Sequence, residues 1–328
     1  MSLFPDARPR RNRRTAWIRE LVRETRLTPA DLIWPIFLTD GPDAEPIPSM
    51  PGVVRHPVTA VGAVMRQAAA LGIPLVALFP NTPADRRSDD GREALNPANL
   101  VCRAIAEAKA ATDAVGVMTD VALDPYTAHG HDGLIDAQGR VLNDATVEVL
   151  VGQALNQARA GADVIAPSDM MDGRIGAIRR ALEDEGFPDT HVMAYAAKYA
   201  SGFYGPFRDA VGAAGRLKGD KQGYQMDPAN VREALREVAL DIAEGADSVM
   251  VKPGLPYLDV VRAVAETSDV PVFAYCVSGE YAMVEAAVAA GMLERERVVP
   301  ELLLAFRRAG ASGVLTYHAP WAAAWLAR

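Results

Sequence analysis

The chain has 328 residues, of which 50% are hydrophobic and 23% charged, and its formal net charge is −8. An acidic chain is poorly suited to bind nucleic acid or an anionic membrane surface. The N-terminus lacks the apolar segment of a secretory signal, and no run of about 18 apolar residues predicts a membrane span. The two cysteines, Cys102 and Cys276, form no CxxC pair. We therefore interpret them as small buried residues and expect a reducing compartment, the cytoplasm.

Residues 1–31 precede the first apolar segment. Their arginines are clustered at Arg8, Arg10, Arg11, Arg13 and Arg14. A basic run can bind nucleic acid, but the acidic remainder of the chain favours a solvated arm or one that holds a neighbouring subunit. The sequence therefore predicts an N-terminal arm over residues 1–31 and a single domain over residues 32–328.

From residue 32 onward, short apolar segments alternate with longer segments of helical pattern. The apolar segments are continuous rather than alternating, which is typical of strands buried on both faces. The predicted strands are 32–38, 75–80, 116–123, 164–169, 192–198, 248–252, 270–277 and 313–317. The predicted helices between them include 60–71, 97–111, 146–160, 175–185, 228–244, 257–267 and 281–290.

Three helices are predicted to end at a similar short motif, Gly-Ala followed by Asp or Ser, which begins at Gly161, Gly245 or Gly310. Each glycine lies just after a helix and just before a strand, as a helix C-cap does. Eight strands in βα alternation predict an α/β fold of the (β/α)8 TIM-barrel class, and a doubly wound open sheet is the alternative. The chain contains neither a GxGxxG after the first strand nor a GxxxxGK[ST] motif, which disfavours a nucleotide-binding open sheet.

Polar side chains gather where the predicted strands end, which is where barrel enzymes carry their active sites. These residues are Asp120, Asp124, Ser168, Asp169, Lys198, Lys252, Ser278, Tyr317 and His318. Residues 199–225 form a long glycine-rich basic loop, which predicts an active-site lid. Its Arg208, Lys221 and Gln225 suit a substrate that carries a carboxylate. We interpret Arg216 and Lys218 as solvated.

Lys198 and Lys252 end adjacent strands and follow apolar residues. Burial and a second nearby cation both lower the pKa of a lysine, and the neutral amine can attack a ketone to form a Schiff base. One such lysine is equally well explained by an ion pair at the barrel rim, whereas two favour carbonyl chemistry. The residues alone therefore predict a barrel enzyme that forms Schiff bases with a small keto acid.

Long strings around both lysines resemble the porphobilinogen synthases, also called 5-aminolevulinate dehydratases. They are MAYAAKYASGFYGPFRDA at 193–210 and MVKPG at 250–254. Shorter strings of the same kind are DVALDPYTAHGHDG at 120–133, APSDMMDGR at 166–174 and VSGEY at 277–281. The resemblance runs from about Arg10 to the C-terminus.

The resemblance implies that two 5-aminolevulinate molecules condense to porphobilinogen, with loss of two waters, in tetrapyrrole biosynthesis. It implies that Lys252 holds the substrate that becomes the propionate side of the product and that Lys198 holds the acetate side. The implied carboxylate contacts are Ser278 and Tyr317 for the first substrate and Arg208, Lys221 and Gln225 for the second. The implied pocket-lining residues are Asp120, Ser168, Tyr204, Phe207 and Tyr275. The arm would wrap a neighbouring subunit, commonly in a homo-octamer.

The chain departs from the zinc-dependent members of this family, which carry three cysteines in the strand-three motif. Those positions hold Ala122, Asp124 and Asp132. Thiolates favour zinc, whereas carboxylates favour magnesium or no metal, so we expect a zinc-independent enzyme without an organic cofactor. The nearby His129 and His131 are interpreted as loop or pocket residues rather than ligands.

Some members of the family bind an activating, allosteric magnesium ion through a glutamate fifteen residues before the second lysine. Glu237 stands at that spacing. An ion pair of Glu237 with Arg236 is the alternative, and an enzyme that needs no metal is another.

Two other functions compete with this one. A class I Schiff-base aldolase usually uses one barrel lysine, often beside a phosphate site late in the barrel, so the lysine pair and the lid disfavour it. A catalytically inactive barrel scaffold predicts damage at the catalytic positions, whereas both lysines, Ser278 and Tyr317 are present.

Overall fold

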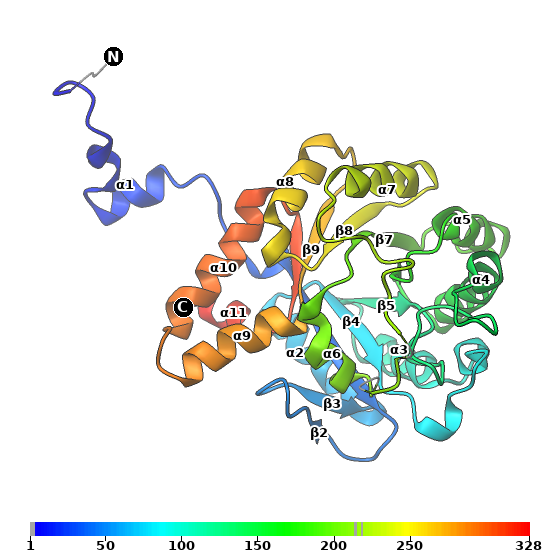
Figure 1. Ribbon diagram of the computed structural model, residues 1–328. Coiled ribbons are helices and arrows are strands. Elements are labelled where there is room, and N and C mark those ends of the chain that lie inside the picture. Colours follow the sequence, from blue (N-terminus) through cyan, green and yellow to red (C-terminus); the bar gives the residue numbers. More distant parts are fainter. Residues whose placement is uncertain (1–3, 213–214, 218) are drawn as a thin grey trace.

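The computed structural model describes residues 4–212, 215–217 and 219–328, and its centre is a closed ring of parallel strands (Figure 1). The ring consists of β1 (Leu32–Thr39), β4 (Leu75–Pro80), β5 (Gly116–Val121), β6 (Val164–Pro167), β7 (His191–Lys198), β8 (Ser248–Lys252), β9 (Val272–Cys276) and β10 (Gly313–Thr316). These strands pair in chain order. β10 pairs back onto β1 through Leu32↔Val314 and Ile33↔Leu315. This closure confirms the predicted barrel and excludes the open sheet.

Helices follow the strands and surround the ring (Figure 1). They are α2 (Val61–Leu71), α3 (Leu100–Ala111), α4 (Asn143–Ala160), α5 (Arg174–Asp184), α7 (Arg232–Ala243), α8 (Leu258–Thr267), α9 (Ser278–Ala289), α10 (Arg295–Ala309) and α11 (Ala319–Leu326). The first seven agree with prediction to within a few residues. The short helices α1 (Ala16–Leu21), α6 (Gly205–Ala210) and α11 are not among the predictions, because so few turns give little periodic pattern.

The predicted glycine C-caps are confirmed by the backbone. Gly161, Gly245 and Gly310 have φ angles of 104°, 106° and 108°. This left-handed region strongly favours glycine, because a Cβ would collide with the backbone. Each of these residues turns the chain from a helix into the next strand of the barrel.

A small hairpin absent from the sequence prediction extends the sheet beside β1. Strands β2 (Glu45–Pro46) and β3 (Val54–Pro57) are antiparallel, and β3 runs parallel to β1 with Phe37 opposite Arg55. These strands are short and carry few apolar residues, so they have no strand pattern of their own. Backbone pairing of β3 with β1, and of β2 with β3, sets their position.

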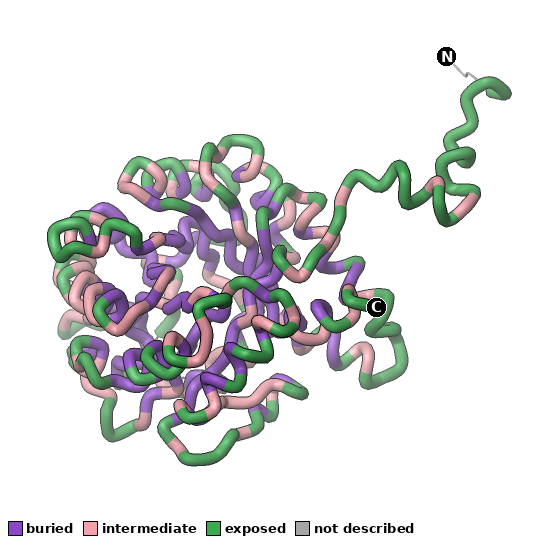
Figure 2. Tube along the Cα trace, turned by 180° about the vertical axis from the view of Figure 1, so that it is seen from behind, coloured by how far each residue is buried: buried purple, intermediate pink, exposed green. Residues whose placement is uncertain are grey.

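Alternate residues of the barrel strands enter two different hydrophobic clusters. In β1, Leu32, Ile36 and Leu38 pack with residues of the surrounding helices. Ile33 and Phe37 instead pack with side chains from other strands. Figure 2 shows buried residues through the centre of the molecule and exposed ones around its outside. Burial on both faces explains why the strands are continuously apolar in sequence.

The described residues before the barrel extend away from it (Figures 1 and 2). In this arm, helix α1 leaves Trp17 68% and Leu21 72% exposed. No helix among the described residues is long and apolar enough to cross a membrane.

Candidate active site

Two lysines face one another across adjacent strands at the mouth of the barrel. Lys198 ends β7, Lys252 ends β8, and the two are directly paired in the sheet. The register shifts by one residue between Ala194 and Ala197 of β7. Without that shift, Ala197 would stand opposite Lys252. A local irregularity therefore re-aims a side chain, as bulges next to active sites do, and brings the two amines together.

Aromatic rings surround the Lys252 ammonium. Its Nζ lies 5.1 Å from the ring centre of Tyr195, 5.5 Å from Tyr204, 5.0 Å from Phe207 and 4.7 Å from Tyr275. The residue is only 5% exposed. Burial and the nearby charge of Lys198 lower the pKa of Lys252 to about 7. Near neutral pH, a large fraction of this amine is therefore uncharged and nucleophilic.

Lys198 has a different environment, in which oxygen atoms surround the amine. Its Nζ lies 3.1 Å from Asp132 Oδ2 and also donates to the backbone carbonyl of Ser168. Two lid residues bind the same carboxylate: Lys221 Nζ lies 2.5 Å from Oδ1, and Gln225 Nε2 lies 3.3 Å from Oδ2. Burial raises the pKa of Asp132, but the ammonium groups of Lys198 and Lys221 outweigh burial and hold that pKa below its ordinary value. Asp132 therefore stays ionised and joins Lys198 to the lid.

Asp120, on β5, adds a titratable group near both lysines. Burial raises the pKa of its carboxyl to about 6, although the charges of Lys252 and Lys198 oppose the increase. Its Oδ1 atom is buried and has no hydrogen-bond partner in the described structure. A carboxyl group with a pKa near the working pH can both accept and release a proton, so Asp120 is placed to exchange protons beside the two amines.

The other predicted pocket residues lie around Lys252. The hydroxyl groups of Tyr275 and Tyr317 are 2.8 Å apart. Ser278 Oγ accepts a hydrogen bond of 2.8 Å from the backbone N–H of Phe207. Tyr204 donates its hydroxyl proton to the carbonyl of Tyr199 at 2.8 Å. Residues from the ends of β9 and β10 and from the lid thus gather around Lys252.

The lid is more ordered than the sequence predicts, because it contains α6 and a preceding turn, η6 (Gly202–Tyr204). Arg208 lies on α6, half-exposed, and makes no ion pair within the described chain. The interpretation of Arg216 as solvated is wrong: its guanidinium is half-buried and donates to the carbonyls of Thr127 and Asp124. Lys218 lies outside the described residues.

Sequence reasoning identified Asp132 only as a substituted cysteine position. Asp132 contacts Lys198 of the barrel and Lys221 and Gln225 of the lid. No sequence pattern predicts these contacts, because the partners are far from Asp132 along the chain. Tyr224 was missed as well. Its hydroxyl accepts from the backbone N–H of Asp132 and lies 3.2 Å from His131 Nδ1, so it adds a further connection between lid and barrel.

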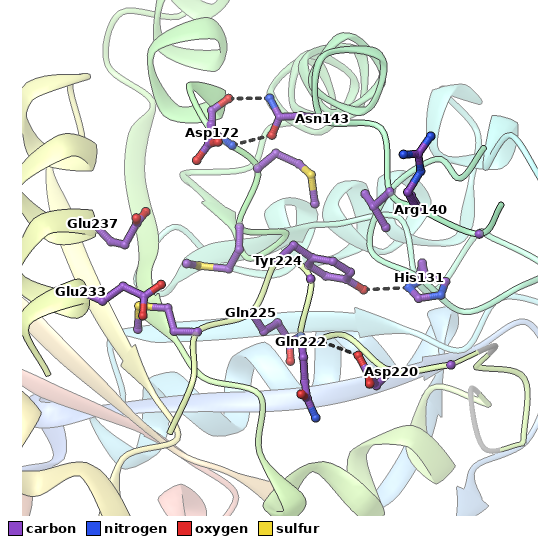
Figure 3. A pocket seen from close by; sticks show the side chains of 17 residues that line it. His131, Arg140, Asn143, Asp172, Asp220, Gln222, Tyr224, Gln225, Glu233 and Glu237 are labelled. Atoms are coloured by element: carbon purple, nitrogen blue, oxygen red, sulfur yellow. Dashed lines mark hydrogen bonds between the residues drawn. The ribbon is translucent and has the colours of Figure 1, made fainter. Parts of the chain in front are cut away.

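A cavity of about 730 Å³ is lined by lid residues 222–225 and by α7 (Figure 3). Glu233 and Glu237 of α7 lie on one side, and Tyr224 and Gln225 lie at the lid. Burial raises the pKa of Glu237, and the negative charge of Asp241 contributes to the increase. Within the described residues Glu237 forms no ion pair with Arg236, which excludes that alternative in this conformation.

The comparisons with known proteins agree with this arrangement. A family model described as delta-aminolevulinic acid dehydratase matches residues 6–325. The chain belongs to the delta-aminolevulinic acid dehydratase family.

Relatives that carry the family's name match nearly the whole chain. The delta-aminolevulinic acid dehydratase of Bradyrhizobium diazoefficiens is 61% identical, over 96% of this chain and 90% of its own length. That of Rhodobacter capsulatus is 56% identical over 98% and 96%. A crystal structure of the Toxoplasma gondii ME49 dehydratase in complex with the reaction product porphobilinogen superposes with a TM-score of 0.96. It is 49% identical and covers 99% of this chain and 92% of its own.

Proposed function

We propose that this chain condenses two molecules of 5-aminolevulinate to porphobilinogen, as a hydro-lyase of tetrapyrrole biosynthesis. The observation that carries the proposal is the pair of facing lysines with different surroundings, Lys252 among aromatic rings and Lys198 beside Asp132. The names of the relatives and the product bound to the Toxoplasma gondii enzyme support it. An aldolase needs only one such lysine, and an inactive scaffold needs neither.

The difference between the lysines predicts an order of attack. The uncharged amine of Lys252 adds to the ketone of one substrate, and loss of water leaves an imine. Lys198 Nζ is paired with Asp132 at 3.1 Å, so this amine must leave its ion pair before it attacks the second ketone. Each imine draws electrons from the neighbouring carbon, which then loses its proton more easily. Over the whole reaction two waters leave.

The carboxylates of the two substrates would bind at different parts of the pocket. We assign Ser278 and Tyr317, next to Lys252, to the first substrate, and Arg208, Lys221 and Gln225, from the lid, to the second. When two substrates are held in a fixed relative position, a bimolecular reaction step becomes effectively unimolecular. Such positioning can lower the barrier by about 7–11 kcal/mol.

The rate is expected to depend on pH through Lys252. Because its pKa is about 7, kcat/KM should rise as the pH increases toward 7 and level off above about 8. An ordinary lysine would give a rise that continues toward pH 10. The charge of Asp120 raises the pKa of Lys252, so Asp120→Asn should move the inflection to lower pH. An inflection that stays in place in this variant, or a steady rise through pH 9, would contradict the assignment.

We propose that the active site works without zinc. Ala122 offers no ligand atom, and the carboxylates of Asp124 and Asp132 already contact Lys221, at 3.4 and 2.5 Å. One alanine and two carboxylates that contact Lys221 thus stand where the zinc-dependent enzymes would carry three thiolates. Porphobilinogen formation should therefore survive a chelator that strips zinc, and loss of activity that only zinc restores would exclude the proposal.

Glu237 is the residue we assign to an allosteric magnesium ion. It faces the cavity with Glu233, and Asp172 also lines that cavity (Figure 3). An excess of carboxylate oxygens suits a hard divalent cation. Magnesium is expected to raise the Tm of the protein and its activity, and Glu237→Gln to abolish both responses. Glu266→Gln is the matched control, because Glu266 is exposed, pairs with Arg262 and does not line this cavity. Equal responses in both variants would remove Glu237 from the site.

A cytoplasmic homo-oligomer, most simply an octamer, belongs to the same proposal. Cys102 and Cys276 are buried free thiols, which suits a reducing compartment. The exposed Trp17 and Leu21 of α1 give the arm an apolar surface that a neighbouring subunit would cover.

A further inference from the structure

Two arginines meet where the lid crosses the end of β4. Arg87 follows the short turn η4 (Ala84–Arg86), and Arg216 lies in the lid. Gly212 lies against both: its carbonyl accepts from Arg216 Nε at 2.8 Å, and a Cβ added to it would lie 2.8 Å from Arg87 Nη2. The two guanidinium groups therefore flank a single lid residue.

Their hydrogen bonding is incomplete. Arg216 donates to the backbone carbonyls of Gly212, Thr127 and Asp124. Arg87 Nη2 donates to Asn81 Oδ1 at 3.3 Å, but the buried Nε of Arg87 has no partner in the described structure. A buried donor without a partner destabilises the protein, so the site lacks an acceptor.

Their charge is uncompensated as well. Neither arginine forms an ion pair with a carboxylate of the described residues. The nearest acid that acts on Arg216 is Asp124, whose Oδ2 lies 3.4 Å from Lys221. Burial and the charge of Arg216 lower the pKa of Arg87 to about 10. Two partly buried cations without an anion repel one another.

We propose that Arg87 and Arg216 form a binding site for a small oxyanion, such as phosphate or a carboxylate, at the base of the lid. The guanidinium group is planar and offers paired donors that match such oxygens. A bound anion would satisfy the free Nε of Arg87, cancel the repulsion and fasten Gly212 to the β4 end of the barrel. Lys221 and Gln225, assigned above to a substrate carboxylate, contact the side chain of Asp132, whereas Arg216 donates only to backbone carbonyls in the described structure.

The test is anion-dependent thermal stability of the whole purified protein without substrate. Inorganic phosphate and, separately, acetate are titrated at constant pH and ionic strength. Phosphate or acetate is expected to raise Tm with saturation. Arg87→Met and Arg216→Met should each weaken the apparent affinity about tenfold or more, because a charge-assisted hydrogen bond is lost. The more effective anion shows whether the ligand is an inorganic oxyanion or a carboxylate.

Arg86→Met is the control, since the neighbouring Arg86 is 55% exposed and faces Glu93; its response should equal that of the unmodified protein. Without added anion, Arg87→Met is expected to melt no lower than the unmodified protein, because the repulsion is relieved. An unchanged anion response in both arginine variants would overturn the proposal. So would a response that is lost in Arg208→Met but kept in Arg87→Met, which would place the anion at the substrate pocket. None of these measurements depends on turnover, so they can fail independently of the proposed function.

Discussion

Replacing Lys252 by methionine is expected to lower kcat for porphobilinogen formation by at least about 10⁴-fold, the scale seen when a covalent nucleophile is removed. Methionine is unbranched and apolar, so it fits among Tyr195, Tyr204 and Tyr275 without disturbing the core. The measurement is colorimetric detection of the pyrrole, with circular dichroism to verify the fold.

Borohydride trapping separates the roles of the two lysines. Reduction in the presence of 5-aminolevulinate should add mass to Lys252 in the Lys198→Met variant, because the neutral lysine reacts first. Lys198 should be labelled weakly when Lys252 is absent. Lys109→Met is the control, since Lys109 binds Asp163 on the outside of the barrel at 2.8 Å and should retain activity. Substantial turnover by Lys252→Met, or label on neither lysine, would refute the Schiff-base mechanism.

Removing the Asp132 carboxylate is expected to cost about 3–5 kcal/mol of the free energy of unfolding, because it leaves buried cations without their partner. Asp132 is fully buried, and its two oxygens contact Lys198 and Lys221. Asp132→Ala should therefore unfold at markedly lower urea concentration, followed by the fluorescence of the four tryptophans. Its kcat should fall as well, since the lid loses the group that Lys221 and Gln225 bind.

Two further variants test whether charge is the cause. Asp132→Asn keeps the size and one acceptor, so its stability should lie between those of Asp132→Ala and the unmodified protein. Asp90→Ala should change little, because Asp90 and its partner Arg92 are both largely exposed and exposed ion pairs contribute little. All proteins are compared at one concentration, since subunit association also affects stability. If Asp132→Ala were as stable as the unmodified protein, the ion pairs of Asp132 with Lys198 and Lys221 would not stabilise the fold.

The barrel and the positions of both lysines could be predicted from local sequence patterns. Strands buried on two faces are apolar at every position, and helices that lead into strands end at glycine, as Gly161, Gly245 and Gly310 do. These patterns depend on neighbours along the chain, so they can be recognised without a structure. Lys198 and Lys252 could be found in the same way, because each is the last residue of an otherwise largely apolar strand.

The contacts among these residues could not be predicted, because they depend on how distant parts of the chain fold together. The one-residue shift in β7 sets Lys198 opposite Lys252, and nothing in the sequence around Ala194 indicates it. Asp132 contacts Lys198 and Lys221, which are 66 and 89 residues away along the chain. Arg216 is half-buried because it donates hydrogen bonds to backbone carbonyls of another loop. A pKa depends on burial and on charges brought close by folding. The proposed order of attack and the proposed anion site at the lid therefore rest on contacts that sequence spacing does not encode.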